Sequence, residues 1–328
     1  MDKKAKRRKL VLLVAILILV LVFLFSGLQI LESTVFRKGT GTSQVSDRKT
    51  IIRDGVEYYP RQDITVILLA GIGEMGPVQD SGSYNNPGEA DMVSLMIFDE
   101  RDETLDILSL NRDTMLDIPV LGISGKPAGT INAQLALAHT YGSGLNDSSE
   151  NLRKAVSELL YGIKIDYYVS MKMDAIGLIN DAVGGVKVMV TDDFSAVDST
   201  ITKGEVTLNG QQAINFVRTR GGVGDQLNLS RMERHNAYMT GFMDALGYKM
   251  DSDASFVLDI HSMVGDYIVT DCSAKGLSAI ADRYGEYRLG DIVTLPGENV
   301  KGKQYMEYHL DEDALDEIIL EYLYSPKK

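Results

Sequence analysis

The chain has 328 residues, with 33 Lys and Arg against 46 Asp and Glu, and its formal net charge is −13. Six of the cations lie in the first nine residues, so the rest of the chain is more acidic still. Such an acidic protein is a poor candidate for nucleic-acid binding, because that affinity comes largely from neutralising phosphates. The single cysteine, Cys272, excludes an internal disulfide, so a hydrophobic core must hold the fold.

The N-terminal residues predict a membrane anchor. Residues 10–31 carry no charge, and this run is long enough to cross a hydrocarbon core of roughly 30 Å as a helix. The basic residues 1–9 then form a cytoplasmic tail, which places the later residues outside the cytoplasm at the cell membrane. A cleaved signal peptide is the alternative, but the apolar run is long and lacks a small-x-small cleavage site. The polar residues 32–60 are expected to form an extracytoplasmic stalk.

Residues 61–328 are expected to form one ectodomain, since no further linker is evident. Its first segment, Ile64–Ala70, is almost continuously apolar, as in a strand buried on both faces. Gly, Ser, Asn and Pro dominate Glu74–Gly88, which predicts a long loop. Met92–Phe98 and Leu105–Leu110 are apolar segments with a charged connection, which predicts a β-hairpin.

The following residues alternate between helical and extended patterns. Apolar residues at helical spacing predict one helix over residues 131–141 and another from residues 147–150, whose Asp-Ser-Ser-Glu sequence resembles a capping box. Further expected elements are a strand at 163–171, a helix at 174–182, a strand at 186–190, a helix ending near residue 250 and an amphipathic helix at 311–323. This alternation predicts an α/β fold in which helices sandwich a central mixed β-sheet.

Four arginines gather in one short segment of this acidic chain, namely Arg218, Arg220, Arg231 and Arg234. Guanidinium groups offer a rigid fork of donors that suits anions with several oxygens. Arg218 and Arg220 share a face if residues 213–220 are extended. Arg231 and Arg234 share a face if the following segment is helical. The residues alone leave two interpretations open, an anion-binding site and a solvated basic patch held by ion pairs.

A second cluster follows the hairpin. Arg112 and Asp113 come directly after the strand Leu105–Leu110, and ligands of open α/β sheets favour the carboxyl ends of strands. Hairpin geometry can bring Asp91, at the start of the partner strand, beside them. Carboxylates next to arginines suit a site in which oxygen ligands hold Mg²⁺ while guanidinium groups take phosphate charge. The same carboxylates also fit internal salt bridges, so both interpretations stay open at this point.

Taken in order, short motifs make the chain resemble the LytR-CpsA-Psr proteins over residues 61–245. The segments that carry the resemblance are Ile64–Gly71, Gly88–Asp91, Leu108–Met115, Thr130–Ala133, Tyr161–Tyr168, Asn180–Val186, Leu208–Gln212, Val217–Arg220 and Arg231–Arg234. An N-terminal membrane anchor is also usual in that family. Many motifs in a fixed order over such a length make the resemblance specific.

The resemblance implies a membrane-anchored phosphotransferase that moves a glycopolymer from an undecaprenyl-pyrophosphate carrier to the cell wall, usually to peptidoglycan. It also implies an apolar tunnel for the prenyl chain, arginines that hold the pyrophosphate, and carboxylates that bind Mg²⁺. By position, Asp91 matches a metal ligand, while Arg112 and Asp113 match a catalytic arginine and a candidate base. The substrate-binding residues predicted from these motifs are Arg112, Arg218, Arg220, Arg231, Arg234 and His235, the last standing where the family commonly has a glutamine.

Two departures from the family pattern bear on the metal. The family usually has Gly-x-Asp after the first strand, whereas this chain has Gly71-Ile-Gly73, so one carboxylate is missing. Where Arg-x-Asp is common, this chain has Glu89-Ala-Asp91, so one arginine is missing. Glu74 and Glu89 are the candidates to replace the lost carboxylate. We therefore expect Mg²⁺ to bind weakly and chiefly when substrate is present.

The favoured function is a transferase in which a sugar hydroxyl attacks the carrier-linked phosphate next to the polymer. Its expected partners are the polyprenyl-pyrophosphate-linked glycopolymer, peptidoglycan and the membrane, but not nucleic acid. One alternative is a lipid pyrophosphate hydrolase that uses water as the nucleophile. The other is a degenerate binding module that holds the lipid-linked polymer without transferring it.

Overall fold

The computed structural model describes residues 50–219, 221–224, 228–252, 256, 263–273, 276, 279–280, 283–284 and 287–327. The expected cytoplasmic tail, the expected anchor at residues 10–31 and most of the expected stalk lie outside these residues, so all three stay predictions. Within the described part of the chain, no helix is both long enough and apolar enough to cross a membrane.

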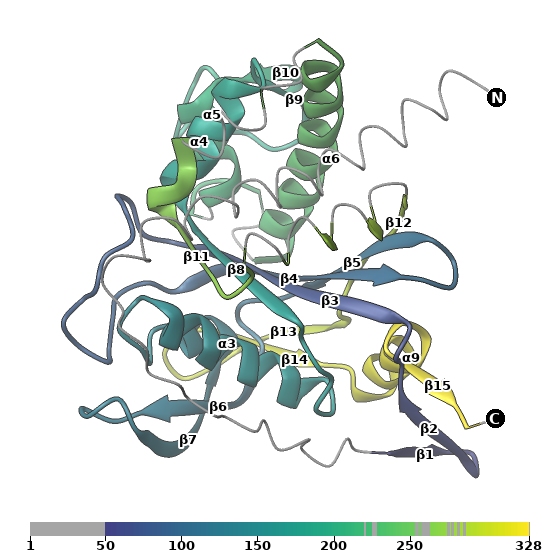
Figure 1. The fold of residues 1–328 in the computed structure, drawn as a ribbon. Coiled ribbons are helices and arrows are strands. Elements are labelled where there is room, and N and C mark those ends of the chain that lie inside the picture. Colours follow the sequence, from purple (N-terminus) through teal and green to yellow (C-terminus); the bar gives the residue numbers. More distant parts are fainter. Residues whose placement is uncertain are drawn as a thin grey trace.

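A six-stranded mixed sheet forms the centre of the fold (Figure 1). Its strands in spatial order are β11 (Ile268–Thr270), β8 (Tyr167–Lys172), β3 (Ile64–Ile72), β4 (Ala90–Asp99), β5 (Thr104–Leu110) and β12 (Arg288–Thr294). The strands β3, β4 and β5 pair in antiparallel fashion, whereas β8 runs parallel to β3 and β12 runs parallel to β5. The predicted central mixed sheet and the predicted β4–β5 hairpin are therefore confirmed.

Helices cover both faces of this sheet (Figure 1). One face packs against η2 (Leu135–His139), α3 (Asn146–Leu159) and α9 (Glu312–Tyr322). The other face packs against α4 (Met173–Ala182), α5 (Gly210–Arg218) and α6 (Asn228–Ser252). The predicted sandwich of helices around the sheet is thus present, and it creates two separate hydrophobic cores.

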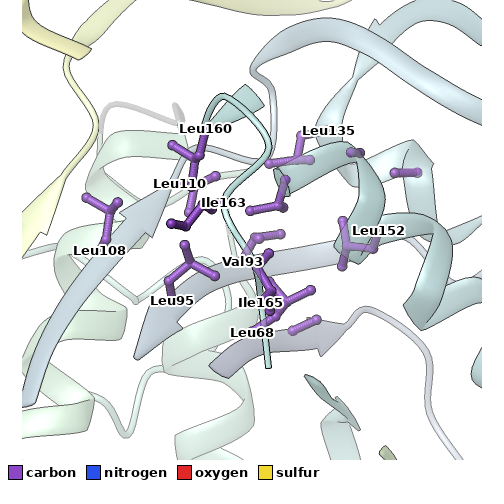
Figure 2. Close-up of a cluster of buried hydrophobic side chains, with 14 of the residues drawn as sticks. Leu68, Val93, Leu95, Leu108, Leu110, Leu135, Leu152, Leu160, Ile163 and Ile165 are labelled. Atoms are coloured by element: carbon purple, nitrogen blue, oxygen red, sulfur yellow. The ribbon is translucent and has the colours of Figure 1, made fainter. Parts of the chain in front are cut away.

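Alternation along the strands explains how one sheet serves two cores. In β3, Val66 and Leu68 join the core on the α3 side, whereas Ile67 joins the core on the α6 side. All three side chains are buried, which is why this strand is a continuous apolar run in the sequence. Figure 2 shows the α3-side core, where Leu68 and its neighbours on the sheet lie near Leu152 of α3.

In the described part of the chain, four small sheets accompany the central one. They are formed by β1 (Ile51–Arg53) with β2 (Val56–Pro60) and β15 (Tyr324–Pro326), by β6 (Met115–Leu121) with β7 (Pro127–Gln134), by β9 (Val186–Val190) with β10 (Gly204–Leu208), and by β13 (Gly297–Lys301) with β14 (Met306–Leu310). A short 3-10 helix, η3 (Gly265–Tyr267), precedes β11. The sequence places residues 51–60 in the stalk, but β2 pairs with the C-terminal strand β15, so these residues belong to the folded unit.

The predicted helix at residues 131–141 is wrong in its first half. Residues up to Gln134 form β7, which pairs in antiparallel fashion with β6, and only Leu135–His139 turn into the 3-10 helix η2. The apolar spacing was compatible with a helix, but pairing with the preceding strand β6 satisfied the backbone instead.

The capping box predicted at residues 147–150 is absent. Helix α3 begins at Asn146 without a side-chain cap, and the Asp147 carboxylate accepts hydrogen bonds from Ser143. A capping box is present elsewhere, where Asn209 and Gln212 bond reciprocally at the start of α5. That helix runs through Arg218. The predicted extended conformation is therefore wrong for residues 213–218.

Candidate functional site

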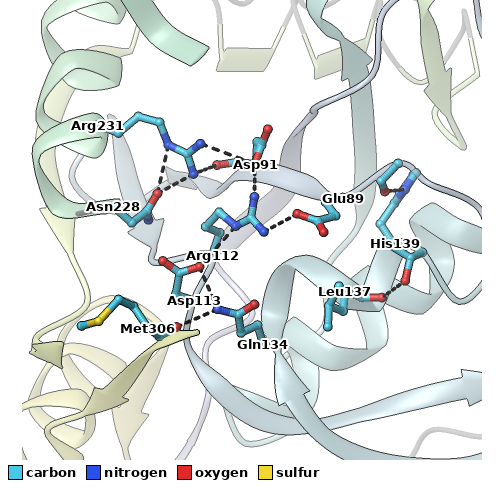
Figure 3. Close-up of polar contacts among 12 residues, drawn as sticks. Glu89, Asp91, Arg112, Asp113, Gln134, Leu137, His139, Asn228, Arg231 and Met306 are labelled. Carbon is cyan, nitrogen blue, oxygen red and sulfur yellow. Dashed lines mark hydrogen bonds and ion pairs between the residues drawn. The ribbon is translucent and has the colours of Figure 1, made fainter. Parts of the chain in front are cut away.

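The β4–β5 hairpin brings a carboxylate and an arginine together. Val93 of β4 lies opposite Leu110 of β5, and continuing this antiparallel register by two residues places Asp91 opposite Arg112. The Arg112 guanidinium donates from Nη1 to Asp91 and from Nη2 to Glu89 (Figure 3). The prediction that Asp91 lies beside Arg112 is therefore confirmed.

The Arg112 side chain is only 10% exposed, so neighbouring carboxylates, and not water, must stabilise its positive charge. Burial disfavours the charged form, but the charges of Asp91 and Glu89 outweigh burial and raise the pKa of Arg112 above its ordinary value. The Glu89 side chain is 44% exposed, which leaves this carboxylate at the solvent edge of the cluster. Phosphate oxygens suit the same guanidinium donors, so an incoming anion would compete with Glu89 for Arg112.

Asp113, the predicted base, lies on the other side of Arg112 (Figure 3). Its carboxylate accepts a hydrogen bond from Gln134 Nε2 at 3.0 Å and lies 3.4 Å from Arg112 Nε. Only 2% of the Asp113 side chain is exposed. Gln134 is itself fixed by a second hydrogen bond, to the carbonyl oxygen of Met306 at 2.8 Å. A base must reach the proton that it removes, so this geometry suits the orientation of Arg112 better than proton transfer.

Arg231 of α6 approaches the same carboxylate from the opposite wall. Its Nη1 lies 3.5 Å from Asp91 Oδ1, and its Nη2 donates to the Asp91 carbonyl oxygen at 3.2 Å. The side chain of Asn228 accepts from Arg231 Nε at 3.0 Å and from Nη2 at 2.5 Å. Asn228 also donates to Asn111 Oδ1 at 2.7 Å. Two arginines, one from the end of β5 and one from α6, therefore converge on Asp91.

Arg234 belongs to the protein interior instead of the predicted pyrophosphate site. Its Nη1 donates to Asp192 at 2.7 Å, its Nε donates to the Phe216 carbonyl oxygen at 3.1 Å, and its Nη2 donates to the Thr219 carbonyl oxygen. The guanidinium also lies over the ring of Phe194. Arg231 and Arg234 are one helical turn apart, as predicted, but these contacts commit Arg234 to joining α6 to the end of α5.

His235 also faces inwards. Its Nε2 bonds to the Val217 carbonyl oxygen at 2.8 Å, and its ring lines an apolar cavity. Because a carbonyl only accepts, this nitrogen carries the proton. Burial, and then the nearby charge of Arg231, lowers the pKa of His235 to about 4. A neutral imidazole whose N–H is already bonded is poorly suited to the predicted contact with pyrophosphate.

Arg218 and Arg220 are the two other arginines of the motif. Arg218 lies in the last turn of α5 and is exposed. Arg220 lies outside the described residues, so its role stays a prediction. Among the described residues, the side chains that bond to the Asp91 carboxylate are those of Arg112 and Arg231. Contact between Arg218 and a pyrophosphate also stays a prediction.

Of the two glutamates that might replace the missing carboxylate, Glu89 lies in the cluster. It shares the Arg112 guanidinium with Asp91. Glu74 instead pairs with the buried Lys172 at 3.0 Å, where β3 and β8 end side by side. This partner neutralises the charge of Glu74 locally. The geometry therefore favours Glu89 over Glu74 as a partner of Asp91.

Gly73 lies directly beside Asp91. A Cβ at this position would lie 3.1 Å from Asp91 Cγ and closer still to Oδ2. A side chain at residue 73 would therefore point at the Asp91 carboxylate, which is where a second metal ligand is needed. The glycine leaves Asp91 and Glu89 as the two carboxylates that bond to the terminal nitrogens of Arg112.

These residues fit a magnesium ion that takes most of its ligands from elsewhere. Mg²⁺ in phosphate-transfer sites is commonly held by one or two carboxylates together with waters and substrate phosphates. Asp91 and Glu89 converge on one guanidinium and supply that number. In the part of the chain that the structure describes, no group of three or more His, Cys, Asp or Glu is arranged to hold a metal by itself. The donor set therefore suits a metal that binds together with phosphate.

An apolar cavity of about 200 Å³ lies between the sheet and the helices α4 and α6. Residues of β3, β4, β5 and β8 form one wall, and Ile176, Tyr238, Met239 and Phe242 lie on the helical wall. Six of the lining residues are methionines, whose flexible side chains adapt to irregular apolar ligands. The cavity is thus suited to a hydrocarbon chain.

A smaller cavity of about 30 Å³ shares lining residues with the apolar cavity and has Asp91 of the charged cluster in its wall. It is lined by Asp91, by the hydroxyl-bearing side chains of Ser94 and Ser109, and by Asn236. Leu69, Met92, Ile107, His235, Met239 and Ile292 line both cavities. The shared lining residues therefore place a charged site and an apolar cavity side by side. This arrangement suits an elongated ligand with an anionic head and an apolar tail.

Sequence reasoning missed Asn111, Gln134 and Asn228. Asn111 directly follows β5, so its place at the carboxyl end of a strand was a usable signal. Asn228 precedes Arg231 by three residues, a spacing at which helical side chains are neighbours. Gln134 had no such signal, because its contact with Asp113 depends on how β7 pairs with β6.

Comparison with known proteins adds independent information. The model of the LytR_cpsA_psr family matches residues 33–321. A relative from Oceanobacillus iheyensis, named polyisoprenyl-teichoic acid–peptidoglycan teichoic acid transferase TagU, is 27% identical over 269 residues, covering 80% of this chain and 76% of the relative. The TagU of Bacillus subtilis is 24% identical over 277 residues, covering 84% of this chain and 82% of the relative.

Solved structures share the fold. A structure titled TagT bound to LI-WTA superposes with a TM-score of 0.58 at 22% identity, over 80% of this chain and 90% of that chain. TagV from Bacillus subtilis superposes with a TM-score of 0.58 at 20% identity, over 79% of this chain and 95% of that chain. Likeness at these identities supports the mixed α/β fold with its central mixed sheet.

Proposed function

Because this chain belongs to the LytR_cpsA_psr family, we propose that it is a phosphotransferase that moves a glycopolymer from a polyprenyl-pyrophosphate carrier to peptidoglycan. The name of the TagU relatives, polyisoprenyl-teichoic acid–peptidoglycan teichoic acid transferase, supports this reaction class. The uncharged residues 10–31 support a single-pass anchor with the N-terminus inside, which would hold the enzyme at the membrane that contains such a carrier. Undecaprenyl pyrophosphate is the carrier that the family resemblance implies.

One observation carries the proposal: the charged cluster and the apolar cavity share a wall. Arg112 and Arg231 provide cations for a pyrophosphate beside Asp91. Met92, next to Asp91 in β4, already lines the large apolar cavity. A prenyl pyrophosphate likewise has a charged part and an apolar part, because its two adjacent phosphates lie at one end of a hydrocarbon chain. A solvated surface patch would not adjoin an apolar cavity, so the ligand-site interpretation of the arginines is the better one.

The chemistry follows from this placement. A hydroxyl oxygen of the acceptor glycan attacks the phosphorus that carries the polymer and forms a new P–O bond. The bond from that phosphorus to the bridging oxygen breaks, so prenyl phosphate leaves and the hydroxyl proton passes to water. Negative charge develops on the leaving phosphate, where fixed guanidinium donors stabilise it more than mobile water would. Arg112 and Arg231 supply these donors. The Asp113 carboxylate lies 3.4 Å from Arg112 Nε and is itself held by a hydrogen bond from Gln134.

Asp91 and Glu89 would hold Mg²⁺ when it is present, and the ion would supply further positive charge to the pyrophosphate. For this to occur, Glu89 would leave Arg112, which its exposed position allows. Arg112 would then be free to bond to phosphate oxygens. Asp91 and Glu89 would then be ligands of the ion, and Arg112 would bond to phosphate in their place.

The test uses the full chain in detergent with a synthetic prenyl-pyrophosphate-linked glycan and a soluble peptidoglycan fragment. We expect a glycan–peptidoglycan product linked through one phosphate, together with prenyl phosphate. Arg112→Ala should lower the rate by roughly 10²–10³-fold, the range for loss of one preorganised donor at a developing anion. Arg153→Ala is the matched control, because Arg153 pairs with Glu150 and Asp271, outside the cluster. Equal rates for wild type and Arg112→Ala would reject the assigned site.

A binding module without transferase activity is the second candidate, and Gly73 and Glu89 favour it. The glycine removes one carboxylate, and Glu89 replaces an arginine with an anion that occupies Arg112. The same assay distinguishes the two. A binding module would retain labelled lipid and give no product, whereas a hydrolase would release prenyl phosphate without any acceptor fragment.

A further inference from the structure

Asn228 is the first residue of α6, and its amide faces two ways. On one side, its Oδ1 accepts two hydrogen bonds from the Arg231 guanidinium, at 3.0 Å from Nε and at 2.5 Å from Nη2. On the other side, its Nδ2 donates to Asn111 Oδ1 at 2.7 Å. Asn228 is only 2% exposed, so water competes little for these bonds. The residue therefore joins an arginine of α6 to the end of β5.

Asn111 anchors the other end of this bridge. It is fully buried at the position that follows β5. Its Oδ1 also accepts from the backbone N–H of Asp113 at 3.0 Å, which fixes the turn that carries Arg112. The amide of Asn228 thus connects the turn that presents Arg112 to the helix that presents Arg231. Figure 3 shows Asn228 beside Arg231 and facing the Arg112 turn.

We propose that Asn228 is a positioning residue that sets the spacing between Arg231 and Arg112 for a ligand with two adjacent phosphates. The proposal rests on the function proposed above, because that function requires both guanidiniums to meet one pyrophosphate. An arginine has a long side chain with several rotatable bonds, and this freedom opposes any fixed geometry of its guanidinium. The Arg231 guanidinium donates two hydrogen bonds to Asn228 Oδ1, and these bonds fix its plane. Its Nη1 then points at Asp91 and the site.

The bridge makes a specific prediction about phosphate number. A ligand with one phosphate can move to whichever arginine is available, so it tolerates a change in spacing. A pyrophosphate that contacts both arginines does not. Loss of the bridge should therefore weaken binding of a prenyl pyrophosphate more than binding of the corresponding monophosphate. Loss of folding would instead reduce both to the same extent.

The first experiment tests the bridge without any ligand. Phenylglyoxal labelling of the full chain in detergent, read by peptide mass spectrometry, reports how accessible each arginine is. Arg231 is 4% exposed and Arg283 is 60% exposed, so Arg283 is the internal reference. In Asn228→Ala, labelling of Arg231 relative to Arg283 should rise about ten-fold, the consequence of losing hydrogen bonds to a charged group. Asn132→Ala, which removes an exposed bond to Asp117, is the matched control.

The second experiment measures affinity for farnesyl pyrophosphate and for farnesyl monophosphate by calorimetry. In Asn228→Ala, affinity for the pyrophosphate should fall about ten-fold and affinity for the monophosphate much less. In an Arg231→Ala background, Asn228→Ala should have no further effect, because the group that it positions is absent. Asn228→Asp keeps an acceptor for Arg231 and should recover part of the loss.

The outcomes separate the two proposals. Unchanged labelling of Arg231 in Asn228→Ala overturns the positioning role, whatever the affinities are. Equal losses for both ligands, or additive effects of Asn228→Ala and Arg231→Ala, also overturn it. If the wild type binds neither ligand yet Asn228→Ala exposes Arg231, the bridge exists but the proposed function fails. Increased labelling together with a selective loss of pyrophosphate affinity supports both.

Discussion

Gly73→Ala tests how tightly the Asp91 carboxylate is held. The added Cβ would lie 3.1 Å from Asp91 Cγ and closer still to Oδ2, so Asp91 must move. Aspartate is short, and its carboxylate is bonded to Arg112 and contacted by Arg231. Rotation away from a favoured rotamer costs about 0.5–1.5 kcal/mol, and weakening one hydrogen bond to a charged group costs up to about 1.5–3 kcal/mol. We expect a loss of about 2 kcal/mol in the free energy of unfolding.

Thermal unfolding of the full chain in detergent measures this loss. For a domain of this size, a change of about 2 kcal/mol corresponds to a decrease of roughly 4–8 °C in Tm. Gly265→Ala is the matched control, because a Cβ at Gly265 has no neighbour within 4 Å. The double variant Gly73→Ala/Asp91→Ala isolates the contact, since the added methyl group then has no carboxylate to displace.

Two results would refute this reasoning. If Gly73→Ala unfolds at the wild-type temperature, the carboxylate moves freely and is not fixed by its arginines. If Gly73→Ala lowers Tm by the same amount with and without Asp91, the cost comes from another neighbour. A loss that disappears in the Asp91→Ala background supports a rigid carboxylate at this position.

Three further predictions follow. Protease added to intact protoplasts should degrade the chain after residue 61 while residues 1–9 stay protected, and complete protection would contradict the assigned topology. Calorimetric titration should show weak Mg²⁺ binding that strengthens with a prenyl pyrophosphate and is lost in Asp91→Ala, whereas tight binding without lipid would contradict a substrate-dependent metal. Burial lowers the pKa of His139 and of His235 to about 4, so the unfolded state binds more protons than the folded state between pH 4 and about pH 6.5. The free energy of unfolding measured in urea should therefore be highest above about pH 6.5 and fall as the pH is lowered towards 4. A flat profile would contradict neutral buried imidazoles.

The sequence by itself determined the elements that have strong local patterns. The continuous apolar run of β3 and the charged connection between β4 and β5 were sufficient to predict those strands, and the hairpin then placed Asp91 beside Arg112. These predictions succeeded because a strand's two faces and a short antiparallel connection leave few alternatives. The order of the motifs likewise identified the family to which the chain belongs.

Only the tertiary structure decided which arginines meet. Local spacing treats Arg231 and Arg234 as equivalent, but α6 packs so that Arg231 faces Asp91 while Arg234 faces Asp192. The sequence also could not show that Glu89 joins Arg112 while Glu74 joins Lys172. These outcomes depend on contacts between residues far apart in the chain, where the direction of a side chain is set by packing across the sheet. Periodicity fixes which face a residue occupies, whereas its partner is fixed by the element that packs against that face.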